Sequence, residues 1–520
     1  MKKHVLMYTM VGVVAVMLII GTTLGGYALS VHYGMTGLKV RPDWTYQRVE
    51  GFGASSAWTY QSLGLIEDEE VKEDAIERLY GDSGLALNIF RYNIGGGGKE
   101  LNVYSDPQRG TESFFNANRF TGDYSVFSNP ANYDFTRDRG ARELFDKALS
   151  KGNIDEVVFF VNSPHYLMTR NGLTHGSRAK ENNLKEECYD AFSDYLLVIT
   201  NWLYTNIICK YDSNIKVYIS PVNEPQWDWG GRGSSQEGCH YDPEVLAKFY
   251  DVFYKKMNEY NESHGTSFMM DIFESGNYKL TESGTKYQAY MKALSKYDYF
   301  DDIQFISAHS YGADTNDSVR NLLYSFHKRN YEGKQVNVSE YCVLQEHVDK
   351  SIDMGLYSAK VIMRDLNTLN AIKWNWWLSV STYDYEDGLV YWHKQDNSLE
   401  VTKRYYTMGQ FTRFIEPGSV RVGTEYGDSL GWNGVECSAF IKTDGRLALI
   451  VINDSKREHK IRFYGGYGTV TEIVTDADRN WAESEYEFDN YLYVPAKSVV
   501  TYIFNGEPPQ DGSTGSLSSK

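Results

Sequence analysis

Cysteine, proline and basic residues are scarce in this chain: it has five cysteines and 11 prolines among 520 residues. The cysteines are scattered, odd in number and without C-x-x-C spacing, which argues against a disulfide scaffold and against a zinc site. Lysine and arginine number 52 against 69 aspartates and glutamates, so the formal charge is −17. A nucleic-acid or anionic-lipid surface needs clustered basic residues, and the charge balance argues against both kinds of partner.

Long apolar runs are also lacking, except for one at the amino terminus. It extends from Val5 to about Leu29 and follows two lysines, an arrangement typical of a secretion signal with a small-x-small cleavage site ending at Ser30. The run is also long enough to span a bilayer. Residues 1–30 are therefore either a signal peptide or a retained membrane anchor, and we expect the remaining chain to be secreted or tethered at the cell surface.

Aromatic residues, in contrast, are abundant: 42 Tyr, 24 Phe and 11 Trp. An apolar fraction of 42% with 23% charged residues is typical of a globular chain and excludes a disordered one. Tyr and Trp at this density either fill cores or form flat platforms on which sugar rings stack.

Strand-like apolar runs alternate with amphipathic helical patterns between residues 51 and 416. Eight strand–helix units predict an α/β fold, namely a (β/α)₈ TIM barrel. The expected strands are Val49–Ala54, Ala86–Ile94, Glu156–Asn162, Lys216–Ser220, Phe268–Glu274, Ile303–Ala308, Gln335–Glu340 and Ala371–Leu378. The clearest expected helices are Asp68–Tyr80, Cys188–Tyr211, Pro243–Tyr260, His347–Leu369 and Lys403–Ile415.

The expected connections differ in length according to their direction. Helix-to-strand connections are short, as at 81–85 and 151–155, whereas strand-to-helix connections are long, the extreme being 95 to about 138. Long structureless loops are uncommon unless they are functional, and in a barrel these loops all emerge on the face that carries active sites. The asymmetry predicts an enzyme rather than a scaffold.

The pattern after Pro417 changes to short alternating strands, which predicts an appended β-sandwich domain over 417–506 without helices. Residues 38–50 have no partner in the barrel and are expected to add a strand to this sandwich. Residues 507–520, rich in Gly and Ser, are expected to form a flexible tail.

Two glutamates stand where the fourth and seventh barrel strands are expected to end. Glu224 follows the fourth strand between two prolines that terminate strand pairing, and Glu340 ends the seventh. A single carboxylate at such a place can be a structural ion-pair partner. Two of them across a barrel mouth can flank a bound group, as the nucleophile and the acid/base of a retaining glycosidase do.

Several segments resemble glycoside hydrolase family 30, a family of retaining glycosidases. The resemblance rests on GFGASSAW at 51–58, RYNIG at 91–95, AHSYG at 308–312, NEP at 223–225 and Glu340. The segment SPVNEPQWDW at 220–229 is most similar to the endo-β-1,6-galactanase branch of that family. The resemblance implies a (β/α)₈ barrel with a β-sandwich built from both ends of the chain.

The resemblance also implies roles for individual residues. Glu224 is the expected acid/base and Glu340 the expected nucleophile. Asn223 is expected to bind the sugar 2-hydroxyl, and Arg91 to lie beside Glu340 and hold it ionised. The other expected substrate-binding residues are His309 and Tyr311 from strand six, and the aromatic walls Trp58, Tyr166 and Trp376 or Trp377.

One motif departs from the family pattern. After strand three the family commonly has Ser-Pro-Pro-x-Trp-Met, whereas this chain has His165 and Leu167 at the second Pro and the Trp. An aromatic wall is therefore lost or moved to Tyr166, and the substrate pocket is expected to differ from that of the family.

The sequence thus predicts a secreted, monomeric endo-glycosidase that hydrolyses β-1,6-galactan, such as arabinogalactan side chains, by double displacement. It predicts no cofactor and no metal, and a neutral glycan as the only partner. The alternatives are a β-1,6-glucanase, a xylanase or a glucosylceramidase-like enzyme of the same family, and a catalytically inactive glycan-binding protein.

Overall fold

The computed structural model describes residues 37–176, 180–230, 235–281, 286–425 and 434–506. The expected signal or anchor at 1–30 and the expected tail at 507–520 lie outside the described residues. Within the described ranges, no helix combines the length and the apolar character needed to cross a bilayer.

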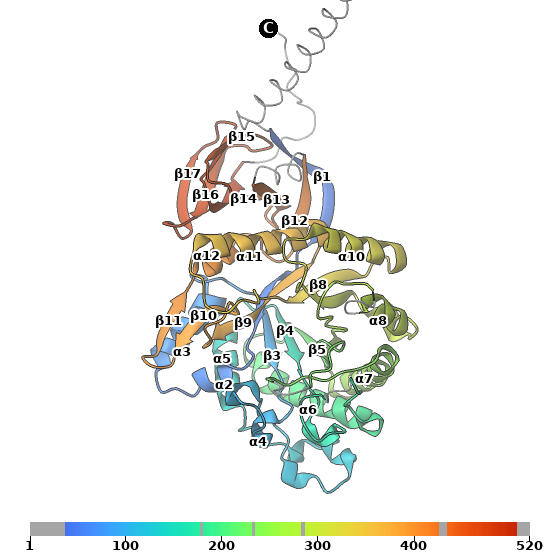
Figure 1. Cartoon of the computed structure of the whole chain (residues 1–520). Helices are drawn as coiled ribbons and strands as arrows, with labels where there is room; N and C mark the ends of the chain where they lie inside the picture. Colours follow the sequence, from blue (N-terminus) through green and yellow to red (C-terminus); the bar gives the residue numbers. More distant parts are fainter. Residues whose placement is uncertain (1–36, 177–179, 231–234, 282–285, 426–433, 507–520) are drawn as a thin grey trace, which may run out of the picture.

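Eight parallel strands, which we call the strand ring, form the centre of the larger domain (Figure 1). Neighbouring strands pair in chain order except β6 and β7, which are linked through a bridge from Ser275, beyond the end of β6, to Ala308. The last strand, β9, pairs with the first, β2. The strands are β2 (Gly51–Ser55), β3 (Ile89–Asn93), β4 (Glu156–Phe160), β5 (Lys216–Ser220), β6 (Met269–Met270), β7 (Phe305–His309), β8 (Gln335–Glu340) and β9 (Lys373–Ser381).

At least one helix follows each of these strands. The principal ones are α3 (Glu69–Tyr80), α5 (Arg139–Leu149), α6 (Tyr189–Asn206), α7 (Pro243–His264), α8 (Tyr287–Leu294), α10 (Asp317–Asn330), α11 (Ile352–Arg364) and α12 (Lys403–Thr412). The starts of α3, α10 and α11 follow from local chemistry, because the side chains of Asp68, Asn316 and Ser351 accept hydrogen bonds from free backbone N–H groups of the first turn. Helix α7 begins with Pro243 and ends at Gly265, whose φ of 66° is left-handed.

Side chains fill the amino-terminal end of the strand ring. The Lys373 ammonium lies 2.7 and 2.8 Å from the two carboxylate oxygens of Glu156, and 4.3 and 4.1 Å from the ring centroids of Tyr218 and Phe305. A buried ion pair needs such close partners to offset its desolvation. This end of the ring is therefore closed, and open space is left at the carboxyl end.

The smaller domain is a β-sandwich whose sheet order is β17-β16-β19-β14-β13-β12-β1-β15-β18. Strand β1 (Leu38–Arg48), far from the others in sequence, pairs antiparallel with β12 and parallel with β15. The remaining strands are β12 (Val420–Glu425), β13 (Val435–Ile441), β14 (Leu447–Asn453), β15 (His459–Tyr464), β16 (Thr469–Thr475), β17 (Ala482–Glu487), β18 (Tyr491–Val494) and β19 (Ser498–Phe504).

The sandwich packs on the helices α11 and α12 (Figure 1). At this contact the buried amide of Gln410 donates to Thr475 Oγ1 at 2.8 Å and accepts from Thr501 Oγ1 at 2.7 Å. Trp481 Nε1 donates to the carbonyl of Tyr406 at 2.7 Å. These satisfied polar contacts fix the two domains against each other.

Three elements differ from the sequence-based expectation because of left-handed residues. The expected strand 268–274 is reduced to the two-residue β6, since Phe273 and Glu274 have φ values of 80° and 47°. Ala86 has φ 50°, and the second strand begins at Ile89 rather than at Ala86. His347 has φ 66°, and the helix expected to begin there begins at Ile352. The hairpin of β10 (Gly388–His393) and β11 (Ser398–Val401), which extends the sheet beyond β9, was not expected.

Candidate active site

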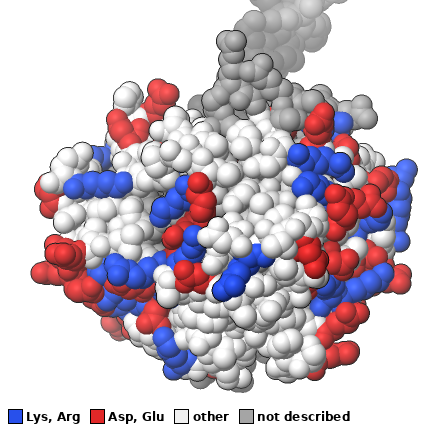
Figure 2. Space-filling model, turned by 90° about the horizontal axis from the view of Figure 1, so that it is seen from below, with Lys and Arg blue, Asp and Glu red and all other residues white. Residues whose placement is uncertain are grey.

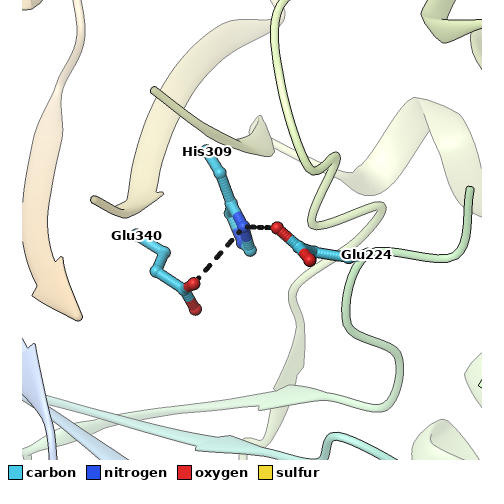
Figure 3. A group of neighbouring side chains, drawn as sticks. All are labelled: Glu224, His309 and Glu340. Atoms are coloured by element: carbon cyan, nitrogen blue, oxygen red, sulfur yellow. Dashed lines mark hydrogen bonds and ion pairs between the residues drawn. The ribbon is translucent and has the colours of Figure 1, made fainter. Parts of the chain in front are cut away.

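The side chains of Glu224, His309 and Glu340 converge at the carboxyl end of the strand ring (Figure 3). One oxygen of each carboxylate and one ring nitrogen of His309 all lie within 4.8 Å of one another. Retaining glycosidases hold their two carboxyl groups about 5–5.5 Å apart, whereas inverting enzymes separate them by about 6.5–9.5 Å to admit a water molecule. The spacing therefore matches a nucleophile paired with an acid/base.

His309 connects these carboxylates to a third one. Its Nδ1 lies 2.8 Å from Glu224 Oε1 and 3.7 Å from Glu340 Oε1, and its Nε2 lies 2.8 Å from Glu274 Oε2. Burial lowers the pKa of His309, but the three surrounding carboxylates outweigh burial and raise this pKa to about 10. His309 is thus an imidazolium at neutral pH, with both ring nitrogens donating.

Glu274 is a third carboxylate of this cluster, which the sequence analysis did not single out. It is fully buried and accepts hydrogen bonds from Arg91 Nη2 at 3.2 Å and from the hydroxyl of Ser339. Burial raises its pKa, yet Arg91 and His309 lower the pKa to about 2, so this carboxylate stays charged. The available signal was its position at the end of the expected fifth strand.

Glu340 is held by Arg91 and Tyr311. Arg91 Nη1 lies 3.4 Å from Glu340 Oε2, and the Tyr311 hydroxyl donates to Glu340 Oε1 at 3.0 Å. Burial raises the pKa of Glu340, and the charges of His309 and Arg91 oppose that rise. Arg91 therefore bridges Glu340 and Glu274 and supplies a fixed positive charge beneath the site.

The sign of this pKa shift gives a prediction for His309→Gln. A nucleophilic Glu340 acts only when ionised, so activity is lost as pH falls through its pKa. Loss of the imidazolium charge raises the pKa of Glu340 further, and we expect the acidic limb of kcat/KM to move to higher pH. A pH profile of kcat/KM measures the shift, with His459→Gln in the sandwich as the control. An acidic limb that stays in place, or moves to lower pH, would contradict the assigned role.

The same three converging side chains are close enough to hold a metal ion. Glu274 already occupies Nε2 of His309, so Nδ1 is the ring nitrogen that faces Glu224 and Glu340.

Two non-glycine residues of the site, Glu224 and Glu274, have left-handed backbone conformations. Glu224 has φ 43° although it precedes Pro225, and Glu274 has φ 47°. Such conformations cost about 1–3 kcal/mol each and are found at functional sites. The Glu224 N–H donates to the Glu274 carbonyl at 3.0 Å, and Trp229 Nε1 donates to the Glu224 carbonyl at 3.0 Å. These bonds hold Glu224 in the orientation that faces Glu340.

Gly276 leaves the space in which Glu224 and Trp227 lie. A Cβ at this position would be 2.5 Å from Trp227 Nε1 and 3.1 Å from Glu224 Oε1. We expect Gly276→Ala to lower kcat/KM by about 10- to 100-fold, because a displacement near 1 Å costs up to about 100-fold. Steady-state kinetics and a thermal unfolding curve check this; full activity, or a loss of activity explained by unfolding, would contradict it.

Glu224 and Glu340 line a cavity of about 530 Å³. Two of its buried polar atoms, Trp58 Nε1 and Asn223 Oδ1, have no hydrogen-bond partner among the described residues. An unpaired buried donor or acceptor costs about 1–3 kcal/mol, and a sugar hydroxyl could satisfy each of them. The cavity is lined by Trp58, Arg109, Asn223, Glu224, Trp227, Trp229, Gln236, Gly276, Asn277, Tyr311, Gly312, Glu340, Cys342, Leu344, Trp377, Tyr385 and Asp387.

Two of the expected aromatic walls do not line this cavity. Trp376 is fully buried, and its Nε1 donates to the Asp387 carbonyl at 2.6 Å, so it is a core residue and Trp377 is the wall. Tyr166 instead stacks on His165, with ring centroids 4.5 Å apart, and does not line the cavity. Side chains alternate along a strand, and the sequence could not decide which of two adjacent rings faces inward.

Arg109 and Asp387 line the cavity although the sequence did not indicate them. Arg109 comes from the long connection after β3, where its guanidinium lies 4.8 Å from the ring centroid of Trp58. Asp387 precedes the unexpected hairpin, and burial raises its pKa to about 7. Neither residue lies in a pattern that could have identified it.

Comparison with known proteins defines the class of this fold. The family model of O-glycosyl hydrolase family 30 matches residues 36–391, and that of the glycosyl hydrolase family 30 β-sandwich domain matches residues 418–502. The protein is therefore a glycoside hydrolase in its fold and domain organisation. The chain belongs to glycoside hydrolase family 30, as the sequence motifs predicted.

Individual relatives are distant. The chain is 24% identical to an endo-β-1,6-galactanase of Hypocrea rufa over 397 residues, covering 74% of this chain and 75% of the relative. The structure of a conserved exported protein from Bacteroides fragilis aligns with a TM-score of 0.75 at 22% identity, covering 90% of this chain and all of that one. The structure of an endo-β-1,6-glucanase aligns with a TM-score of 0.64 at 19% identity, covering 91% and 94%. At these identities the solved structures show the fold alone.

Proposed function

We propose that the protein is a retaining endo-glycosidase that hydrolyses β-1,6-galactan by double displacement. The observation that carries this proposal is the convergence of Glu224 and Glu340 within 4.8 Å. Glu340 attacks the anomeric carbon while Glu224 gives its proton to the departing glycosidic oxygen. Glu224 then takes a proton from water, and the resulting hydroxyl group displaces Glu340 from the sugar.

We also propose that the larger domain is a (β/α)₈ barrel. In its support, eight parallel strands neighbour one another in chain order, with a bridge from Ser275 to Ala308 between β6 and β7. Each strand is followed by a helix, and the last strand pairs with the first. Glu224 and Glu340 follow or end the fourth and seventh of these strands, at the end where barrel enzymes carry their active sites.

The proposed substrate rests on three observations. The relative from Hypocrea rufa is an endo-β-1,6-galactanase. The cavity offers aromatic rings and unpaired polar atoms, as a neutral sugar requires. On the face seen in Figure 2, charged side chains of both signs lie mostly towards the edges, without a patch of one sign. A β-1,6-glucan is the second candidate, because a β-1,6-glucanase shares the fold and this chain has Leu167 in place of the family's Trp after strand three.

Product analysis on a substrate panel tests the proposal. Purified protein is incubated with β-1,6-galactan, β-1,6-glucan, xylan and a glucosylated lipid, with Glu340→Gln as the inactive control. We expect oligosaccharides from β-1,6-galactan, released first as β-anomers in proton NMR spectra. First release of α-anomers would contradict the retaining mechanism. Release from another glycan alone would reassign the substrate, and binding without turnover on every substrate would indicate a glycan-binding protein.

We also propose that the enzyme acts outside the cytoplasm, because Lys2 and Lys3 precede a long apolar run from Val5 to about Leu29. Expression of the full chain, followed by fractionation into medium, membrane and cytoplasm, tests this. Activity confined to the cytoplasm would contradict export.

A further inference from the structure

A second cavity of about 410 Å³ lies beside the catalytic one. Its walls come from the β10–β11 hairpin, from the connection that precedes the hairpin and from residues 348–350. Small-molecule sites have volumes of about 300–1,000 Å³, so this cavity is large enough to hold part of a glycan. No step of the proposed mechanism uses it.

The two cavities share a wall made of Arg109 and Tyr383. The Arg109 guanidinium lies 4.8 Å from the ring centroid of Trp58 in the catalytic cavity and 4.9 Å from that of Tyr383 in the second cavity. The Tyr383 hydroxyl donates to Asp106 Oδ2 at 2.7 Å, which fixes the wall to the long connection after β3. Gln108 lines the second cavity and the adjacent Arg109 the first, so one short segment borders both.

The lining of the second cavity has the chemistry that recognises uncharged sugars. Aromatic rings of Tyr383 and Trp392 stand beside amide, hydroxyl, ammonium and carboxylate groups. Charges of both signs are present, and Glu400 accepts from Lys350 and from His393, so no single-sign field selects an ion. The side chains of Lys394 and Gln395 are exposed at the rim, where they can reach a bound chain.

The position of the wall between the two cavities determines which end of the glycan reaches the second cavity. The acid/base protonates the departing oxygen, so the leaving-group sugars lie on the side of Glu224, beside Trp227 and Asn277. The second cavity lies past the wall formed by Trp58 and Arg109, which come after β2 and β3, across the strand ring from β5 and β6 that precede Trp227 and Asn277. A chain that continues there from the cleaved bond belongs to the non-reducing side of the substrate.

We infer that this second cavity binds the distant non-reducing-side sugars of a neutral β-glycan whose cleaved bond lies between Glu224 and Glu340. The inference rests on the proposed hydrolase function and deepens it, since such a site favours internal cleavage of long chains over attack on short ones.

The double variant Lys394→Ala/Gln395→Ala tests the inference, because both side chains are exposed and their loss leaves the core intact. Lys292→Ala, an exposed lysine of α8, is the matched control. The probes are β-1,6-galacto-oligosaccharides of three and six units, or those of the glycan that the wild type cleaves. We expect kcat/KM for the hexasaccharide to fall about 5- to 30-fold, the equivalent of two lost hydrogen bonds, and that for the trisaccharide to change less than about twofold.

A second measurement separates binding from turnover. Calorimetric titration of Glu340→Gln, with and without the two alanines, should show the same fall in affinity for the hexasaccharide alone. An equal loss on both lengths, or an unchanged hexasaccharide, would overturn the inference and leave the hydrolase proposal standing. A wild type that neither cleaves nor binds any member of the panel would overturn both.

Discussion

Glu340→Gln is expected to abolish glycan hydrolysis, with kcat lower by about 10⁴- to 10⁶-fold, the range seen when a covalent nucleophile is removed. The amide has nearly the same shape, and its one carbonyl oxygen can still accept from Tyr311 or from Arg91, so we expect the fold to persist. Steady-state kinetics on the preferred glycan and circular dichroism measure both effects. Glu483→Gln, on an exposed strand of the sandwich, is the matched control.

The smaller variant Glu340→Ala makes the test specific for a nucleophile. Removal of the side chain opens space for azide, which can attack the anomeric carbon of an activated β-glycoside in place of the carboxylate. The expected product is the α-glycosyl azide, because a single displacement inverts the anomeric carbon. Near-normal turnover in Glu340→Gln, or a β-azide from Glu340→Ala, would contradict the assignment.

Glu224→Gln is expected to lower kcat/KM on natural glycans by about 10²- to 10⁴-fold, the usual contribution of general acid–base catalysis. For a dinitrophenyl glycoside, the rate of glycosyl-enzyme formation should be almost unchanged, because that leaving group departs without a proton. The glycosyl-enzyme should then accumulate, since no base activates water. Stopped-flow measurement of dinitrophenol release should show a burst equal to the enzyme concentration.

The azide experiment distinguishes Glu224 from Glu340. With Glu224→Ala, azide attacks the intermediate after Glu340 has inverted the carbon once, so the product is the β-azide. Equal losses on natural and activated substrates would show that Glu224 acts through structure rather than through proton transfer. The proposal therefore predicts the α-azide from Glu340→Ala and the β-azide from Glu224→Ala.

Much of the strand ring follows from the sequence because its signals are local. Lys216–Ser220 and Gln335–Glu340 form strands with the expected bounds, and Pro243 starts its helix as expected. Apolar strands, capping residues and proline act over a few residues, so the sequence displays them directly. The motifs around Glu224 and Glu340 likewise identified the carboxylates that converge in the structure.

The remaining features depend on contacts between distant segments. Glu274 becomes a partner of Arg91 and His309 only after a left-handed turn shortens β6. Arg109 reaches the cavity from a connection without periodic pattern, and Trp376 and Trp377 differ only in which way the strand presents them. Composition and residue spacing do not determine such contacts between distant segments.

Strand β1 has a consequence for how the chain is made. Lys39 pairs with Glu425, and Leu38 with Phe463, so the sandwich needs residues separated by most of the chain. At about 5–20 residues per second, ribosomal synthesis between the first two partners takes roughly 20–80 s. Throughout that interval β1 has unpaired edges, and its pairing comes late because closing so long a loop is slow. The sandwich can therefore assemble only in a chain that has been synthesised past β12, because a shorter chain leaves β1 without a sheet to join.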